Sequence, residues 1–212
     1  MRALVTGAAS GIGRACCERL VRRAGQNGET DVAIAAMDIA PSAALDTLIT
    51  HLEQAGARAT ALTGDLADPL TPERAVKEAI DALGGLDTLV SNAGVNAPGK
   101  LLDYTVEDWD RLFAVNTRAT WLLGKAAHDA LAAAAGSIVI IASMSGSNAH
   151  ANLGAYAPSK AAVIMLMRVM AQEFGPDGIR VNSVSPGMVK TGMTRDVYSN
   201  NGVAQARADL VP

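Results

Sequence analysis

Residues 3–13 read Ala3-Leu4-Val5-Thr6-Gly7-Ala8-Ala9-Ser10-Gly11-Ile12-Gly13. The apolar run at the start predicts a short strand, and the amphipathic pattern after the last glycine predicts a helix. The glycines permit a tight turn and a close approach of the backbone to a ligand. A helix start offers free N–H groups and the positive end of the helix dipole, which suit a phosphate. An ordinary strand-to-helix connection is the alternative, but strand, turn and helix in this order favour a pyrophosphate site. Its predicted contacts are Gly7, Ser10, Gly11, Ile12 and Gly13.

The rest of the chain alternates between short apolar runs and longer amphipathic stretches. Strands are predicted at 3–6, 32–38, 57–63, 88–91, 137–142 and 180–184, and helices at about 12–23, 43–54, 72–83, 106–134 and 155–174. Strand and helix in alternation predict an α/β fold, a three-layer doubly wound parallel sheet. The run 137–142 is apolar almost throughout, which is typical of a strand buried on both faces. We find no linker and expect one domain over residues 1–212.

Composition excludes several classes of protein. The chain has 212 residues, of which 50% are apolar and 18% charged, so a disordered chain is excluded. The net charge of −3 and only two Trp, two Phe and three Tyr argue against a nucleic-acid surface. No uncharged apolar run is long enough to span a membrane, and the N-terminus lacks a signal-peptide pattern. Cys16 and Cys17 are adjacent, which favours a reduced, cytoplasmic protein. The three histidines show no metal spacing, so no metal is expected.

The second predicted strand ends in Asp38. A carboxylate at this strand tip can accept hydrogen bonds from the hydroxyls of an adenosine ribose, and it repels a 2′-phosphate. Neither neighbour of Asp38 is basic, and Ser10 rather than a basic residue precedes Gly11. The sequence therefore predicts NAD in preference to NADP. A plain turn residue at the strand end is the alternative interpretation of Asp38.

Three polar residues in the second half suggest proton chemistry. Tyr156 and Lys160 are four residues apart in a predicted helix, so their side chains share one face. A lysine ammonium near a phenol lowers the pKa of the phenol, which then exchanges protons more readily near neutral pH. Ser143 follows the predicted strand 137–142, at the edge of the sheet where ligands bind. Taken singly, these residues could equally be a packed ring, a surface charge and a loop serine.

Taken together, the motifs resemble those of the short-chain dehydrogenase/reductase family, a group of oxidoreductases with an NAD(P)-binding Rossmann fold. The matches occur in the family's order between residues 6 and 191. They are Thr6-Gly7-Ala8-Ala9-Ser10-Gly11-Ile12-Gly13, Asp65-Leu66, Asn92-Ala93-Gly94, Asn116, Ser143, Tyr156 with Lys160, and Pro186-Gly187. No single motif is decisive, but the set is specific.

The resemblance implies roles for these residues. Tyr156 is then the catalytic acid/base, and Lys160 lowers its pKa and holds the nicotinamide ribose. Ser143 positions the substrate oxygen, and Asn116 keeps a water in a proton relay. The implied cofactor contacts are Asp65 and Leu66 at the adenine, Asn92, Ala93 and Gly94 along the adenosine side, and Pro186, Gly187, Val189 and Thr191 at the nicotinamide end.

The family pattern also implies a substrate region and a continuation of the chain. Residues 186–212 correspond to the substrate loop, and the family's last helix and strand are then lacking, so an exposed sheet edge is expected. Five residues are weaker candidates for substrate contact. They are Ser145, His150, Met188, Met193 and Tyr198.

We therefore expect an NAD-dependent oxidoreductase for a secondary alcohol or ketone. The alternatives are an NADPH-dependent 3-oxoacyl-thioester reductase and a cofactor-binding protein without catalysis. Expected partners are a small-molecule substrate, with neither nucleic acid nor membrane, and further copies of the chain. The predicted helices 106–134 and 155–174 carry more apolar residues than one sheet face can cover, among them 163, 164, 166, 167 and 170. A homodimer through these helices is expected, and a tetramer is the further possibility.

Overall fold

The computed structural model describes residues 1–28 and 30–195. Its described strands form one sheet in which every pair is parallel, in the order β3-β2-β1-β4-β5-β6. Their bounds are β1 Arg2–Thr6, β2 Ala33–Asp38, β3 Arg58–Thr63, β4 Thr88–Ser91, β5 Ser137–Ile141 and β6 Arg180–Val184. The predicted α/β parallel sheet is confirmed. The strand order reverses direction between β1 and β4, which is where ligands bind in such sheets.

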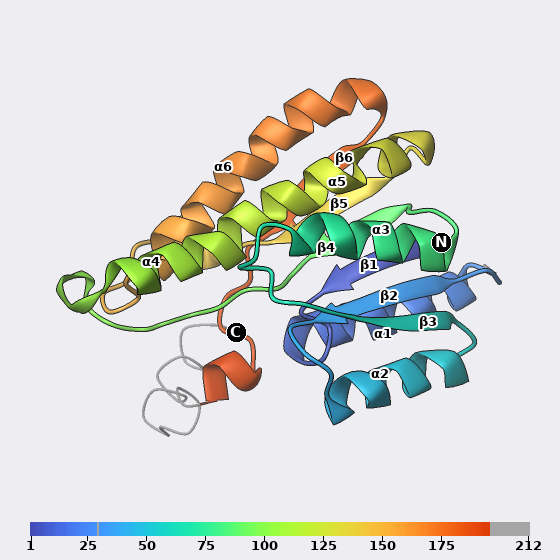
Figure 1. Ribbon diagram of the computed structural model, residues 1–212, viewed down its shortest axis with the longest axis horizontal. Coiled ribbons are helices and arrows are strands. Elements are labelled where there is room, and N and C mark those ends of the chain that lie inside the picture. The colour runs from blue at the N-terminus through green and yellow to red at the C-terminus, as the bar shows by residue number, and fades with distance from the viewer. Residues whose placement is uncertain (29, 196–212) are drawn as a thin grey trace.

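Helices cover the two faces of the sheet as separate layers (Figure 1). One layer holds α1 Gly11–Gln26 and α2 Ala43–Gln54, and the other holds α3 Thr71–Leu83, α5 Ala119–Ala133 and α6 Tyr156–Phe174. Successive strand residues face opposite layers, so Leu4 packs in one core and Val5 in the other. Short 3₁₀ segments complete the connections: η1 Leu101–Asp103, η3 Met144–Gly146, η4 Gly175–Asp177 and η5 Gly192–Thr194.

The predicted single helix over 106–134 is divided in the structure. It consists of α4 Val106–Phe113, the π-helical segment η2 Ala114–Arg118, and α5. A π-helical turn inserts an extra residue into a helix and re-aims the side chains around it. Asn116 lies within this turn, and its side chain bonds to the backbone of Val95 instead of lying on a regular helix face. The periodicity of apolar residues does not reveal such a turn, because it extends over only five residues.

Burial of β5 corrects a second expectation. Ile138 and Ile140 are buried, whereas Val139 and Ile141 are half-buried, so β5 alternates instead of being covered on both faces. Within the described residues, α5 packs against β5 and α6 against β6, both in the same core layer. On the neighbouring edge strand β6, Val184 is 53% exposed.

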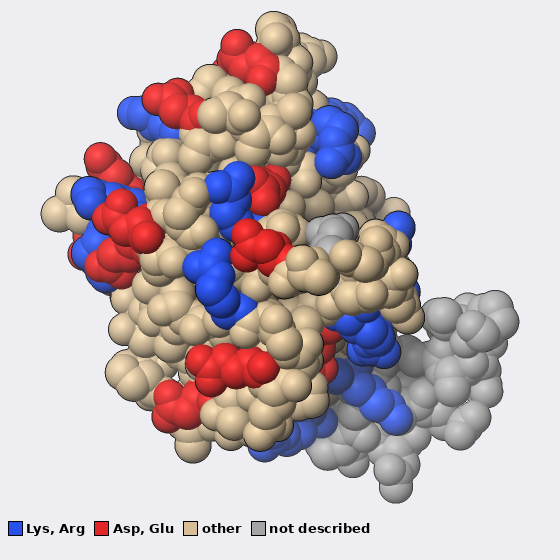
Figure 2. Space-filling model, turned by 90° about the vertical axis from the view of Figure 1, so that its right-hand side faces the viewer, with Lys and Arg blue, Asp and Glu red and all other residues tan. Residues whose placement is uncertain are grey.

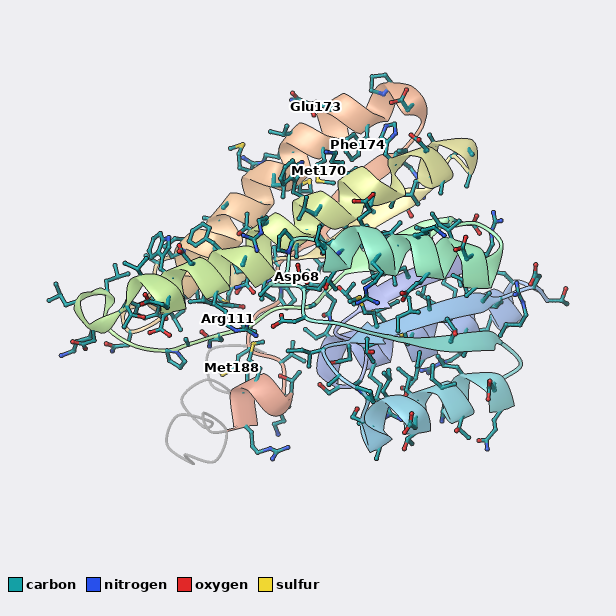
Figure 3. The ribbon with its side chains drawn as sticks, in the orientation of Figure 1. Asp68, Arg111, Met170, Glu173, Phe174 and Met188 are labelled. Atoms are coloured by element: carbon teal, nitrogen blue, oxygen red, sulfur yellow. The ribbon has the colours of Figure 1, made fainter. Side chains whose placement is uncertain are left out.

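The surplus of apolar residues on α6 is only partly turned outward. Val163 and Met170 are buried, and the remaining members of the predicted set, Ile164, Leu166 and Met167, pack half-buried against the core. Met170 and Phe174 lie between α6 and α5, while Glu173 lies on the outer side of α6 (Figure 3). The large apolar side chains that are exposed on this helix are instead Met165 and Val169. The prediction that some members of the set point away from the sheet therefore agrees with three half-buried side chains, and the two large exposed side chains lie outside that set.

The surface shows no concentration of one sign of charge on the face that Figure 2 presents. Lys and Arg side chains are interspersed there with Asp and Glu. Among the described helices, none is both long enough and apolar enough to cross a membrane.

Candidate active site

A cleft of about 270 Å³ opens at the carboxyl ends of β1, β4 and β5. The structure brings together most of the residues that the sequence analysis assigned to a cofactor. These are Gly7, Ser10, Gly11, Ile12, Asp38, Asn92, Ala93, Gly94, Tyr156, Lys160, Pro186, Gly187, Val189 and Thr191. Ser143 lines the same cleft. The N-terminus of α1 borders it, so free backbone N–H groups lie at this edge.

The turn after β1 requires glycine at specific positions. Gly7 has a φ of +65°, a region that favours glycine. A Cβ on Gly13 would lie 2.1 Å from the carbonyl oxygen of Gly7, so no side chain fits there. Asn92 holds the turn from the neighbouring strand end, because its Nδ2 donates to the carbonyl oxygens of Thr6 at 2.9 Å and Gly7 at 3.1 Å. Gly13 thus lies behind the cleft and shapes it without lining it.

A smaller cavity of about 150 Å³ adjoins the turn and contains the predicted adenine contacts Asp65 and Leu66. Asp38 borders both cavities, and its two carboxylate oxygens accept hydrogen bonds from the N–H groups of Ala9 and Ile39, each at 2.8 Å. Arg111 also lines the smaller cavity and pairs with Asp65 at 3.1 Å. The pKa of Asp65 is lowered by the N–H of Ala67 and by the Arg111 guanidinium.

The predicted Tyr156 and Lys160 pair is formed at the start of α6. The ammonium of Lys160 lies 5.9 Å from the centroid of the Tyr156 ring and donates to the carbonyl oxygen of Ile141 at 2.8 Å. Burial lowers the pKa of Lys160 to about 8. Burial raises the pKa of Tyr156, and the Ser143 hydroxyl lowers it by less. The pKa of Tyr156 is thus raised, where the sequence predicted a lowering by Lys160, whose ammonium lies over the ring and donates to a carbonyl.

Asn116 lies behind these residues and is buried. Its Oδ1 accepts from the N–H of Val95 at 2.8 Å, and its Nδ2 donates to the carbonyl of Val95 at 3.0 Å. The same Nδ2 donates to the hydroxyl of Ser159 at 3.0 Å. Ser159 in turn donates to the carbonyl of Tyr156 at 2.7 Å. A hydrogen-bonded chain thus connects the π-helical segment with the first turn of α6.

A third cavity, of about 530 Å³, lies on the other side of Ser143 and Tyr156. Four of the weaker candidates line it: Ser145, His150, Met188 and Met193. Tyr198 lies outside the described residues. Two residues labelled in Figure 3 mark the neighbouring cavities: Arg111 on α4 lines the smaller cavity, and Met188 in the loop after β6 lines the 530 Å³ cavity. Ser143 and Tyr156 line both the 270 Å³ cleft and this cavity.

Several residues of the site were not predicted from the sequence. Ser159 is three positions after Tyr156, and this spacing on one face of the helix is the signal that could have indicated it. Arg111 and Val115 line the smaller cavity, and Asn96 lines the 530 Å³ cavity. Arg111 is exposed and Asn96 lies in a loop. Neither residue therefore belongs to a periodic apolar pattern from which its position could have been predicted.

The arrangement fits a nicotinamide dinucleotide. A glycine turn that a Cβ would block, a helix N-terminus and an acidic strand tip follow one another along the cleft. Within residues 1–28 and 30–195, no three His, Cys, Asp or Glu side chains are grouped as metal ligands.

Comparison with known proteins gives matches over most of the chain. A family model described as short chain dehydrogenase matches residues 1–202. Meso-2,3-butanediol dehydrogenase of Serratia marcescens is 34% identical over 212 residues, covering 97% of this chain and 80% of that protein. L-Rhamnose 1-dehydrogenase (NAD(P)+) of a Sphingomonas species is 37% identical over 196 residues, covering 91% of this chain and 74% of that protein. A crystal structure of a short chain dehydrogenase from Burkholderia cenocepacia in complex with NADP has a TM-score of 0.83 and 37% identity, covering 91% of this chain and 76% of that one.

Proposed function

The chain belongs to the short-chain dehydrogenase family, and from this premise we propose that it transfers a hydride between NAD and a secondary alcohol or its ketone. The observation that carries the proposal is the position of Tyr156 and Ser143, which line both the cofactor cleft and the adjoining 530 Å³ cavity. A substrate oxygen in that cavity lies where these two hydroxyls can reach it. The bound nicotinamide supplies the hydride acceptor or donor.

The side chains of this site then handle the proton and the orientation. In oxidation, Tyr156 takes the proton of the substrate hydroxyl as the carbon loses its hydride, and in reduction it returns that proton. Ser143 donates a hydrogen bond to the same oxygen and orients it. Lys160 holds the nicotinamide ribose, and Asn116 holds the loop at Val95 in place. The partly enclosed cavity and the fixed side chains supply proximity, which is a large part of such catalysis.

The test is a substrate screen with the purified protein and a Tyr156→Phe variant. Tyr156→Phe keeps the ring and removes the proton, so turnover falls by roughly a hundredfold or more while the dissociation constant of NADH stays unchanged. A fully active Tyr156→Phe variant would disprove the role of Tyr156. Binding of cofactor with no turnover of any alcohol or ketone would indicate a cofactor-binding protein without catalysis.

We propose NAD as the preferred cofactor because of the charge at Asp38. Its carboxylate borders the cleft where a 2′-phosphate would lie, and the nearby cation Arg111 is paired with Asp65. Two like unit charges at about 4 Å repel by about 1 kcal/mol in water and about 4 kcal/mol at an effective dielectric of 20. NADH is therefore expected to bind at least about tenfold more tightly than NADPH. The related Burkholderia cenocepacia protein binds NADP, so equal affinity by fluorescence titration is the result that would contradict this proposal.

We also propose a homodimer through α5 and α6. Trp121 on α5 is 47% exposed, and Met165 and Val169 on α6 are 55% and 43% exposed. Large exposed apolar side chains on neighbouring helices are typical of an interface. Light scattering at micromolar concentration tests the proposal, with Met165→Glu as the variant that should dissociate the dimer. A monomeric protein at that concentration would contradict it.

A further inference from the structure

The 530 Å³ cavity beside Ser143 and Tyr156 has a wall without acidic or basic side chains. None of its described lining residues is Asp, Glu, Lys or Arg. Its polar side chains are hydroxyls, the amide of Asn96 and the exposed imidazole of His150. Its apolar side chains are Met144, Ala149, Ala151, Leu153, Met188 and Met193. A carboxylate or phosphate in this cavity would therefore meet neither a lysine nor an arginine among these residues.

The large apolar side chains of this wall are exposed instead of packed in the core. Met144 and Met193 are both exposed, although each lines a concave site. Exposed apolar side chains that gather in a cavity mark a surface that an apolar ligand can cover. A methionine side chain is also unbranched and flexible, so it can pack around apolar groups of different shape. The composition of the wall thus favours an apolar substituent.

Two nearby cations do not supply the missing charge. The ammonium of Lys160 lines the 270 Å³ cleft and not this cavity, and it donates to the carbonyl oxygen of Ile141 at 2.8 Å. Arg111 lines the smaller cavity and pairs with Asp65 at 3.1 Å. Both cations thus lie on the side proposed for the cofactor. A carboxylate that enters the 530 Å³ cavity loses water without gaining either of them as a partner, which is costly.

We propose that this cavity takes ketones and secondary alcohols whose larger substituent is apolar and uncharged, and that it rejects substrates with a carboxylate near the reacting carbon. The reacting oxygen binds Ser143 and Tyr156, while the apolar substituent lies against the methionines of the wall. A keto acid or hydroxy acid of the same size is then a poor substrate. This inference rests on the proposed dehydrogenase function and narrows its substrate class.

The experiment compares three ketones of closely similar size and shape, whose chains end in an isopropyl group, a carboxamide or a carboxylate. They are 5-methyl-2-hexanone, 4-oxopentanamide and 4-oxopentanoate. Reduction with NADH is measured at about pH 8, where the carboxylate is ionised and a free imidazole is uncharged. The wild type is expected to have a kcat/KM at least about 100-fold higher for 5-methyl-2-hexanone than for 4-oxopentanoate, with the amide between them.

A lysine in the cavity wall should reverse part of this preference. Met188→Lys is expected to raise kcat/KM for 4-oxopentanoate at least about tenfold and to lower it for 5-methyl-2-hexanone. Met144→Lys serves the same comparison if Met188→Lys does not fold, because the Met144 side chain is already exposed. Leu102→Lys is the matched control, since it adds the same charge at an almost fully exposed position outside the cavity and keeps the wild-type ratio.

The outcomes separate this inference from the proposed function. An equal or higher kcat/KM for 4-oxopentanoate in the wild type overturns the inference and leaves the dehydrogenase function standing. A preference for 5-methyl-2-hexanone that neither lysine variant reduces also overturns it, because the preference would then arise outside this cavity. No turnover of any ketone or alcohol, with either NAD or NADP as the cofactor, overturns the proposed function and this inference with it.

Discussion

The side-chain amide nitrogen of Asn116 lies 3.0 Å from the hydroxyl oxygen of Ser159, in the buried space behind Tyr156. Ser159 also donates to the carbonyl of Tyr156 at 2.7 Å. One hydroxyl thus connects the π-helical segment, the first turn of α6 and, through Asn116, the loop at Val95. The acid/base residue proposed here and the loop that bears Asn96 therefore have a common support.

Removing this hydroxyl should disturb catalysis more than cofactor binding. Ser159→Ala leaves Nδ2 of Asn116 without its second acceptor, and the expected loss of stability is about 1–3 kcal/mol. Because Tyr156 and Lys160 lie on the turn that Ser159 fixes, kcat should fall by roughly tenfold, while the KM for the cofactor changes little. Steady-state kinetics and chemical denaturation measure both effects.

Ser147→Ala, at an exposed position near the same site, is the matched control. A double-mutant cycle with Asn116→Ala tests the connection itself, because residues in one hydrogen-bond network are not additive. Additive losses in kcat for Ser159→Ala and Asn116→Ala would show that the two side chains act independently.

The glycines of α1 offer a comparison between two sites in one helix. A Cβ on Gly13 would lie 2.1 Å from the carbonyl oxygen of Gly7, whereas a Cβ on Gly25 would have nothing within 4 Å. Gly13→Ala must shift the turn, so it should destabilise the protein by about 1–3 kcal/mol or more and weaken NADH binding at least about tenfold. Gly25→Ala should stabilise the helix by about 0.5–1 kcal/mol and leave NADH binding unchanged.

Thermal unfolding and fluorescence titration with NADH distinguish these two substitutions. Equal effects at both positions would contradict the steric explanation, since it depends on what the added methyl group meets rather than on helix propensity.

The parts of the fold that the sequence predicted are those with repeated local signals. The strand at 88–91 and the helix at 43–54 have their predicted bounds, because each combines apolar periodicity with clear ends. The π-helical turn at Ala114–Arg118 carried no such signal, since its geometry depends on the long-range bonds of Asn116 to Val95. The half-exposure of Val139 depends likewise on which helices pack on which face.

Within the site, motif residues were easier to predict than their surroundings. Gly7 and Tyr156 belong to motifs whose residue types follow from local geometry, a tight turn and one helix face. Both residues line the cleft. Ser159 contacts Asn116, a residue far away in the chain, and Asn96 lines a cavity that several distant segments build, which no local spacing encodes. The direction of the Tyr156 pKa was mispredicted for the same reason, because burial, a property of the whole fold, raises it and outweighs the Ser143 hydroxyl.

The buried ammonium of Lys160 should cost stability in return for function. Its pKa is lowered from 10.5 to about 8, which corresponds to roughly 3 kcal/mol against the charged form at neutral pH. Lys160→Met removes that cost but also the hydrogen bond to Ile141, worth about 1–3 kcal/mol if the carbonyl stays unpaired. We expect the variant to be inactive and as stable as the wild type or more stable by about 1 kcal/mol at pH 7.

The pH dependence gives a sharper test of Lys160. Between its folded pKa of about 8 and its unfolded pKa of 10.5, the unfolded chain binds more protons, so wild-type stability gains a contribution as the pH rises through this window. Lys160→Met should lack this gain. Urea denaturation at about pH 7 and about pH 9.5 measures it, with Lys100→Met at an exposed position as the control. A parallel pH dependence in wild type and Lys160→Met would refute the burial argument.

His128 should produce the opposite pH dependence at the far end of α5. Its Nδ1 and Nε2 atoms each lie 3.0 Å from a carboxylate, that of Asp129 and that of Asp177, and both carboxylates raise its pKa above 6.5. The folded state then binds the proton more tightly than the unfolded chain. The contribution of His128 to the free energy of unfolding is fully present below pH 6.5, the pKa of the unfolded chain. It is lost as the pH rises through the higher pKa of the folded state.

Thermal unfolding at about pH 5.5 and about pH 8.5 should therefore show a larger decrease in Tm for the wild type than for His128→Asn. Asp177→Asn should reduce the decrease in part, because Asp129 remains. If the wild type and His128→Asn lose the same Tm between these pH values, His128 is not responsible for the pH dependence.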